Sequence, residues 1–230
     1  MKISIIIPTY NEKNNILPLL NSLKINGNKN ICEVIIVDSP LSNDNLSEIF
    51  IDYEVKYSVS PESGRAKQMN FGAKLAKGEI FYFVHADVIL PFNFDFEILK
   101  AFNDSYHLGC FRFKFISENI LLRVNSFVAR LPFLWCRGGD QTLFINKSSF
   151  ELLNGYNETF EIMEEYDLIQ RAKEKFRFKI VKNYVLVSNR KYLNNSYLKV
   201  QIANLNAMRM FLKGNVPSRE IKEYYTKYLA

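Results

Sequence analysis

Two side chains that could do chemistry together, His85 and Asp87, follow directly after an apolar run. The run at 80–84, IFYFV, is rich in aromatic and β-branched residues, which is typical of a strand buried on both faces of a sheet. Ligands bind at the carboxyl ends of the strands in open α/β sheets, and residues two apart share a side of an extended backbone. We therefore expect both side chains to face one ligand. The alternative is a polar strand end whose aspartate caps the next loop.

Further polar residues should lie at the same edge of the sheet. The run at 2–7 predicts a buried first strand that ends at Pro8, and a polar loop follows at 9–12. The run at 33–37 predicts a second strand that ends in Asp38. Because apolar residues at helical spacing lie between the two strands, this part forms a βαβ unit with a right-handed crossover. Asp38 and the 9–12 loop should then meet at the carboxyl edge.

Charged residues at two expected helix starts suit an anionic substrate. A helix predicted over 63–77 begins with Ser63, Gly64 and Arg65, so free backbone N–H groups and a guanidinium meet there, which suits a phosphate. Four acids at 161–167 precede a helix predicted over 168–175, and one of them could act as a positioned base. In both places an ordinary helix N-terminus with solvated charges is the alternative.

The second half of the chain is less regular. Strands are expected at 108–115, 142–146 and 185–188. A capping box at 148–151 should open a short helix. The basic pair Arg190 and Lys191 comes after the last strand. The apolar segment 121–135 predicts an amphipathic helix or a hydrophobic flap, and an ordinary core helix is the favoured alternative.

Two helices, at 197–212 and 217–228, should close the chain and dock on the core. We expect a catalytic domain over 1–195 and a helical appendage over 196–230. With 230 residues, 48% of them hydrophobic, the chain is long enough for this arrangement.

Composition excludes several classes of protein. Three scattered cysteines favour neither a disulfide framework nor a zinc site, so a reducing cytoplasm is expected. No apolar stretch is long enough to span a bilayer. The net charge of +6 favours anionic partners such as phosphates or the acidic inner face of a membrane, and leaves peripheral membrane contact open. Dispersed basic residues and the lack of a recognition motif disfavour nucleic acid.

Six short motifs, in order along the chain, resemble those of the family-2 glycosyltransferases. They are SIIIPTYNE at 4–12, EVIIVD at 33–38, GRAKQMNFGA at 64–73, HAD at 85–87, GDQ at 139–141 and MEE at 163–165. Within that family the chain is most similar to the bacterial branch called radical-SAM/selenodomain-associated transferase 2. The resemblance implies an α/β GT-A fold, which is Rossmann-like, with a mixed, mostly parallel central sheet and C-terminal helices.

The resemblance also implies an inverting, metal-dependent hexosyltransferase that uses a nucleotide-diphosphate sugar, with a UDP-sugar as the expected donor. The donor would be bound by Pro8, Tyr10, Glu12, Asp38, Arg65, Asn70, His85, Asp87, Gln141, Arg190 and Lys191. Asp87 matches the second acid of the family's Asp-X-Asp motif and would hold Mn²⁺ or Mg²⁺ on the diphosphate. Glu165 matches the catalytic base that activates an acceptor hydroxyl, and Asp140 would face the donor sugar or the acceptor. The acceptor would be lipid-linked or a small hydroxylated molecule.

Three positions depart from the family pattern. Pro40 has a fixed φ and no N–H, so the nucleotide loop should differ in shape, which leaves the base of the donor open. His85 stands in place of the first Asp of the metal motif. Glu165 stands where Asp is usual, which leaves Glu164 as an alternative base. A nucleotide-sugar-binding protein without transfer, and a nucleotidyltransferase on a related fold, are the alternative functions.

Overall fold

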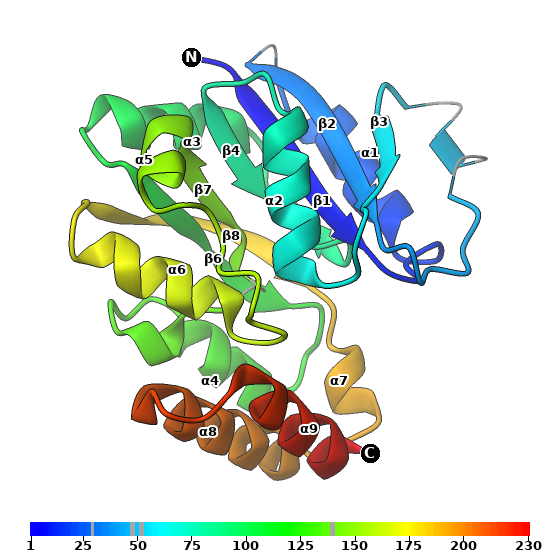
Figure 1. Ribbon diagram of the computed structural model, residues 1–230, viewed down its shortest axis with the longest axis vertical. Coiled ribbons are helices and arrows are strands. Elements are labelled where there is room, and N and C mark those ends of the chain that lie inside the picture. The colour runs from blue at the N-terminus through cyan, green and yellow to red at the C-terminus, as the bar shows by residue number, and fades with distance from the viewer. Residues whose placement is uncertain (29, 47–48, 51–52, 139–140) are drawn as a thin grey trace.

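The computed structural model describes residues 1–28, 30–46, 49–50, 53–138 and 141–230. Its centre is an eight-stranded sheet in the order β3-β2-β1-β4-β7-β6-β8-β5 (Figure 1). The strands are β1 (Ile3–Thr9), β2 (Ile31–Asp38), β3 (Lys56–Val59), β4 (Ile80–Phe83), β5 (Val88–Ile89), β6 (Leu108–Phe115), β7 (Leu143–Asn146) and β8 (Phe178–Val187). Within the described residues the pairs β1–β2, β1–β4, β2–β3 and β6–β8 are parallel, and three are antiparallel. The mixed, mostly parallel sheet is therefore confirmed.

Helices cover both faces of this sheet (Figure 1). They are α1 (Ile16–Asn26), α2 (Arg65–Leu75), α3 (Phe94–Asn103), α4 (Ile120–Val128), α5 (Lys147–Leu152), α6 (Glu164–Lys173), α7 (Arg190–Leu193), α8 (Tyr197–Lys213) and α9 (Ser218–Leu229), with a 3₁₀ turn η2 (Leu134–Cys136). Side chains of β1 alternate between the two faces. Ile5 and Ile7 pack with α1 and α3, whereas Ile6 packs with α2. Each fully buried side chain of this kind contributes about 1.5–3 kcal/mol.

The parallel register of the central strands sets the position of the polar edge. Thr9 lies opposite Asp38 at the end of β1 and β2, and Ile6 lies opposite Phe83 at the end of β4. The residues that follow these strand ends therefore emerge at one edge of the sheet, as expected from the sequence.

The two long C-terminal helices dock on the body of the protein. Ala207 of α8 and Ile221 of α9 form a buried cluster with Met163, which directly precedes α6. Ser218 adds polar contacts, since its Oγ donates to the carbonyl of Thr159 at 2.9 Å and accepts from the N–H of Glu161 at 2.9 Å. The expected docking of these helices on the core is confirmed.

Strand β1 does not end at Pro8 as predicted but continues to Thr9. The carbonyl of Ile6 accepts a hydrogen bond from Val84 on the β4 side. Backbone groups two residues apart along a strand point the same way, so the nitrogen of Pro8 faces the region where β4 has already ended. Because no residue of β4 lies opposite Pro8, its missing N–H removes no hydrogen bond from the sheet.

Several elements from residue 88 onward also differ from the prediction. Strand β8 has ten residues instead of the four expected, while β5 and α3 were not predicted at all. The capping box at 148–151 is wrong, because Asn146 caps α5 by accepting from the N–H of Ser149 at 2.7 Å. The acids expected before a helix lie instead in its first turn, since α6 begins at Glu164.

The segment 121–135 divides into two parts. Helix α4 ends at Val128, and η2 follows only after Pro132, a residue that cannot continue a helix. The first part is an amphipathic helix, with Leu122 and Ser126 buried and Val124 and Phe127 exposed.

Candidate active site

Most of the predicted site residues gather at the carboxyl edge of β1, β2 and β4. Arg65 opens α2, Glu164 and Glu165 open α6, and Arg190 opens α7. His85 and Asp87 follow β4, but the chain turns at 86–87. The extended backbone expected through Asp87 is therefore wrong, and the two side chains contact different partners.

The first group joins His85, Arg65 and the two glutamates. Nε2 of His85 lies 3.0 Å from Oε1 of Glu165. Arg65 places NH1 3.8 Å from the same oxygen and Nε 3.2 Å from Oε1 of Glu164. Three chain segments far apart in the sequence thus meet around a pair of buried carboxylates.

The pKa values of the two adjacent glutamates shift in opposite directions. Burial would raise the pKa of Glu165, but the hydrogen bond with His85 and the charge of Arg65 outweigh it and lower that pKa to about 2. Burial, followed by the charge of Glu165, raises the pKa of Glu164. Burial lowers the pKa of His85, yet its bond to Glu165 prevails and the pKa is raised. Glu165 is accordingly an anion paired with a readily protonated imidazole.

The second group is centred on Arg190. Its NH2 donates to Oε1 of Glu12 at 2.8 Å and lies 3.2 Å from Oδ2 of Asp87, and its NH1 donates to Oε2 of Glu12 at 3.2 Å. Asn15 also donates to Glu12, at 2.6 Å. The guanidinium therefore bridges the loop after β1 and the turn after β4.

The third group surrounds Asp38, which is buried. Its Oδ1 accepts from Oγ1 of Thr9 at 2.8 Å and from the N–H of Ser39 at 3.0 Å, while the hydroxyl of Tyr57 donates to Oδ2 at 3.2 Å. Pro40 occupies the second position of a turn closed by a bond from Ser42 to Ser39, where a fixed φ is favourable. The loop after β2 thus has a defined shape around Asp38. Oδ1 of this carboxylate accepts two hydrogen bonds and Oδ2 accepts one.

Some predicted residues have other partners. The amide of Gln141 is buried and donates to the carbonyl of Ala129 at 3.3 Å. Pro8 is buried within β1, and Tyr10 is exposed. Lys191 lies over the ring of Tyr225 in α9. Asp140 and Gly139 lie outside the described residues.

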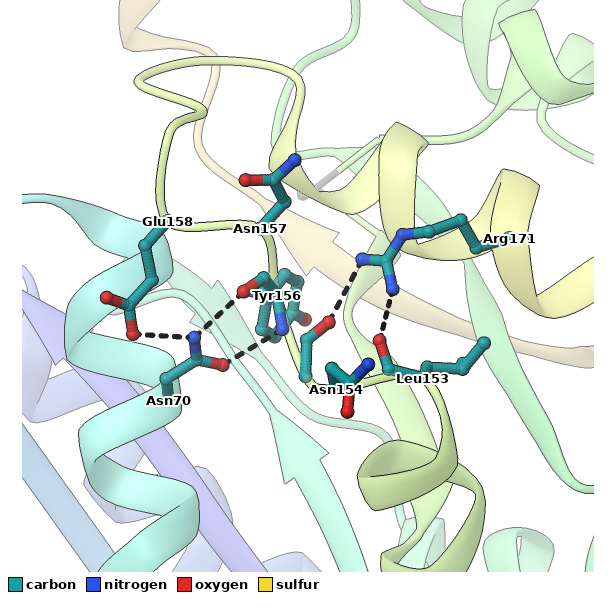
Figure 2. Close-up of a pocket in the computed structure, with 8 residues that line it drawn as sticks. Asn70, Leu153, Asn154, Tyr156, Asn157, Glu158 and Arg171 are labelled. Atoms are coloured by element: carbon teal, nitrogen blue, oxygen red, sulfur yellow. Dashed lines mark hydrogen bonds between the residues drawn. The ribbon is translucent and has the colours of Figure 1, made fainter.

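Asn70 braces a loop beside a cavity of about 420 Å³ between α2 and α6 (Figure 2). Its side chain accepts from the N–H of Tyr156 and donates to the carbonyl of that residue, each at 2.9 Å, and also donates to Glu158 at 2.8 Å. On the opposite wall Arg171 donates to the carbonyls of Leu153 and Gly155. The side chains of Asn70 and Arg171 thus form hydrogen bonds within the protein and hold the loop in place. We therefore do not interpret this cavity as the reaction site.

The residues at the carboxyl edge fit a divalent metal only together with a bound phosphate. The described residues contain no group of three or more His, Cys, Asp or Glu side chains that could hold a metal. Magnesium is usually bound through one or two carboxylates and substrate phosphate oxygens, however, and Asp87 can supply such a carboxylate. The ion would have to replace Arg190 as the partner of Asp87.

Sequence reasoning missed Tyr156, which the fold brings to the buried glutamates. Burial, and then the charges of Glu165 and Glu164, raise the pKa of its phenol well above the usual value. Its hydroxyl has no hydrogen-bond partner among the described residues. No local signal marks this residue, because it lies in an irregular loop.

Among the described residues, no helix is sufficiently long and apolar to cross a bilayer.

Comparisons with known proteins agree with this architecture. The family model for glycosyl transferase family 2 matches residues 4–151. An uncharacterised glycosyltransferase of Rickettsia conorii is 24% identical over 182 residues, which are 72% of this chain and 30% of that protein. The poly(ribitol-phosphate) β-N-acetylglucosaminyltransferase TarS of Staphylococcus aureus is 36% identical over 117 residues, which are 46% of this chain and 20% of TarS. The chain thus spans less than a third of the length of these relatives.

Solved structures of TarS residues 1–349 share the fold. The complexes with UDP and with UDP-GlcNAc each superpose with a TM-score of 0.67 at 19% identity. They cover 100% of this chain and 71% and 72% of those chains. This likeness confirms the expected fold.

Proposed function

Since the chain belongs to glycosyl transferase family 2, we propose that it is an inverting enzyme that transfers a sugar from a nucleotide diphosphate to an acceptor hydroxyl. The observation that carries this proposal is the pairing of Glu165 with His85 at the carboxyl edge, next to the turn that bears Asp87. We propose a UDP-sugar as the donor, because the structural neighbour TarS has been solved with UDP and UDP-GlcNAc.

In the proposed reaction Glu165 takes the proton of the acceptor hydroxyl. The acceptor oxygen forms a bond to the anomeric carbon as the bond from that carbon to the diphosphate oxygen breaks, and the nucleoside diphosphate leaves on the opposite side. Arg65, whose side chain is 47% exposed beside the two glutamates, would turn from them toward a bound diphosphate in this step. When that charge moves away, the pKa of Glu165 rises and the carboxylate becomes a better base.

The leaving diphosphate requires positive charge. Arg190 and Lys191 supply part of it from the start of α7. A Mn²⁺ or Mg²⁺ ion between Asp87 and the diphosphate would add Lewis-acid stabilisation of the leaving group. We further propose that residues 1–195 form the catalytic domain with 196–230 as an appendage, and that the enzyme works in the cytoplasm.

The test is release of UDP from a UDP-sugar in water or with an acceptor. Glu165→Gln should lower the rate by at least 100-fold, as loss of a general base does, while the Kd for UDP stays within about two-fold. Glu174→Gln, an exposed glutamate just after α6, is the matched control and should keep the wild-type rate. Full activity of Glu165→Gln would refute the assigned base, and the same experiment on Glu164→Gln then decides between the two.

One observation favours a second candidate, a nucleotide-sugar-binding protein without transfer. A carboxylate with a pKa of about 2 is a weak base, and Glu165 has such a pKa in the donor-free protein. This candidate predicts that UDP raises the melting temperature although no UDP is released from any donor.

A further inference from the structure

One face of α4 and of the segment that follows exposes apolar side chains. Ile120, Val124 and Phe127 share a side of the helix and are 64%, 52% and 60% exposed, while Leu122 and Ser126 on the opposite side are buried. The exposed set continues beyond the helix with Leu131, Phe133 and Trp135, and the rings of Phe133 and Trp135 stack with centroids 5.7 Å apart. We call these six residues the α4 patch.

The backbone that carries the α4 patch is held by a buried arginine. Arg137 donates to the carbonyl of Ala129 at 2.7 Å and also to the carbonyls of Leu131 and Phe133. It thereby engages the carbonyl at the C-cap of α4, which lacks a helical partner, and two carbonyls of the segment that follows. The hydroxyl of Tyr166 in turn donates to the carbonyl of Arg137. The patch is therefore a fixed surface.

Helix α8 runs next to α4 and carries a second apolar row. The side chain of Asn125 in α4 accepts from the hydroxyl of Tyr197 in α8 at 2.8 Å and donates to that of Tyr192 in α7 at 3.3 Å. Helices α4 and α8 lie side by side in Figure 1. The exposed apolar residues of α8 are Leu198, Ile202, Leu205 and Leu212.

Charge divides sharply between these segments and the rest of the protein. Residues 119–138 and 175–219, which carry both apolar rows, contain thirteen Lys or Arg residues and no Asp or Glu. The rest of the chain has seventeen Lys or Arg residues against all 24 acids, a formal charge of −7. The net charge of +6 is thus the sum of +13 in these segments and −7 elsewhere. Exposed apolar side chains in segments whose charged residues are all basic are complementary to an anionic lipid surface.

We propose that the α4 patch docks on the headgroup and acyl boundary of an anionic phospholipid bilayer, with Arg123 and Arg130 contacting the lipid phosphates. Arg123 in α4 and Arg130 just after it are both exposed, and the guanidinium of Arg130 lies over the ring of Phe127, 4.7 Å from its centroid. Aromatic and branched apolar residues beside arginines are typical of helices that lie in a membrane interface.

This surface adjoins the candidate active site. Tyr166, which bonds to Arg137, follows Glu165 directly, and Arg190, which contacts Asp87, begins the helix that leads into α8. Resting on the proposed function, this placement gives the acceptor class as a hydroxyl presented by a lipid at the membrane surface. Docking itself does not require transfer, so the two proposals can fail separately.

The experiment uses Trp135, which is the single tryptophan of the chain. The intact protein is titrated with vesicles of phosphatidylcholine containing 30% phosphatidylglycerol and with vesicles of pure phosphatidylcholine. We expect the Trp135 emission to shift to the blue, and brominated lipid to quench it, with the anionic vesicles alone. Cosedimentation should show Phe127→Ser weakening binding by about ten-fold and Arg123→Gln by about five-fold.

Phe96→Ser is the matched control, because Phe96 is 57% exposed on α3 and lies outside the patch. It should bind vesicles as the wild type does. Absence of binding to anionic vesicles, or an equal loss in Phe96→Ser and Phe127→Ser, would overturn the proposal. So would a stable dimer that Phe127→Ser dissociates, since a second copy would then be the occupant of the patch. Release of UDP in the absence of lipid would still support the transferase.

Discussion

Nε2 of His85 lies 3.0 Å from Oε1 of Glu165, although 80 positions separate the two residues in the chain. His85 stands where the family's metal motif has its first acid, yet here it contacts the proposed base. Its place at the end of β4 and the place of Glu165 in the first turn of α6 bring the two motifs together.

The pH dependence of turnover should report this contact. His85→Asn removes the partner that lowers the pKa of Glu165, so that pKa should move up from about 2 toward its ordinary value of 4.5. The acid limb of the rate of UDP release should therefore shift upward by at least one pH unit. An unchanged acid limb would show that Glu165 is not the group whose ionisation the rate follows.

Stability should depend on pH through the same pair. The pKa of Glu165 is lowered on folding, so its contribution is present above about 4.5 and is lost as pH falls toward about 2. The pKa of His85 is raised on folding, so its contribution is present below 6.5 and is lost as pH rises through the folded value. The melting temperature of the wild type should exceed that of His85→Asn most between pH 4.5 and 6.5. A difference that is constant from pH 4.5 to pH 9 contradicts the pairing.

Glu164 should behave in the opposite way. Burial and the charge of Glu165 raise its pKa, so ionised Glu164 costs stability above about pH 4.5. Glu164→Gln keeps the shape and removes the charge, and should raise the melting temperature more at pH 7 than at pH 4, as scanning calorimetry would measure. A variant that is less stable at pH 7 than at pH 4, relative to wild type, would mean that the ion pair with Arg65 outweighs burial.

Donor affinity should depend on Arg190. Removal of a charge-assisted contact to phosphate costs about 1.5–3 kcal/mol, so Arg190→Gln should weaken UDP binding by about ten-fold or more. Isothermal titration with and without Mn²⁺ measures the Kd for UDP. Asp87→Ala should remove only the gain in UDP affinity that Mn²⁺ provides. Asp104→Ala, whose carboxylate pairs with Lys179 at an exposed site, is the control. Equal UDP affinity in wild type and Arg190→Gln would exclude Arg190 from the donor site.

The loop after α5 should be sensitive to a single methyl group. Gly155 has φ +67°, and a Cβ there would lie 2.7 Å from Oδ1 of Asn70. Gly155→Ala should therefore lower the free energy of unfolding by about 2–3 kcal/mol, measured in urea. Gly214 has φ +72° with no atom within 4 Å of such a Cβ, so Gly214→Ala should cost only about 1 kcal/mol. If Gly155→Ala and Gly214→Ala lower the free energy of unfolding equally, Asn70 does not crowd a side chain at position 155.

The fold and the family could be predicted from the sequence because their signals are local. Continuous apolar runs mark β1, β2 and β4, and the polar residues that follow them must emerge at one edge of a parallel sheet. Elements without such a signal were missed. Strand β5, which was missed, has two residues, and only the end of β8 was predicted, because lysines interrupt the apolar residues earlier in that strand.

The sequence by itself determined which residues reach the carboxyl edge, because strand ends and helix starts follow from local periodicity. Only the tertiary structure decided how those residues pair. Arg190 meets Glu12 across 178 positions, and Asn70 bonds to the loop at Tyr156, a contact that no local pattern contains. Side-chain partners depend on the long-range packing of helices against the sheet, and periodicity within one segment carries no information about the segment that packs on it.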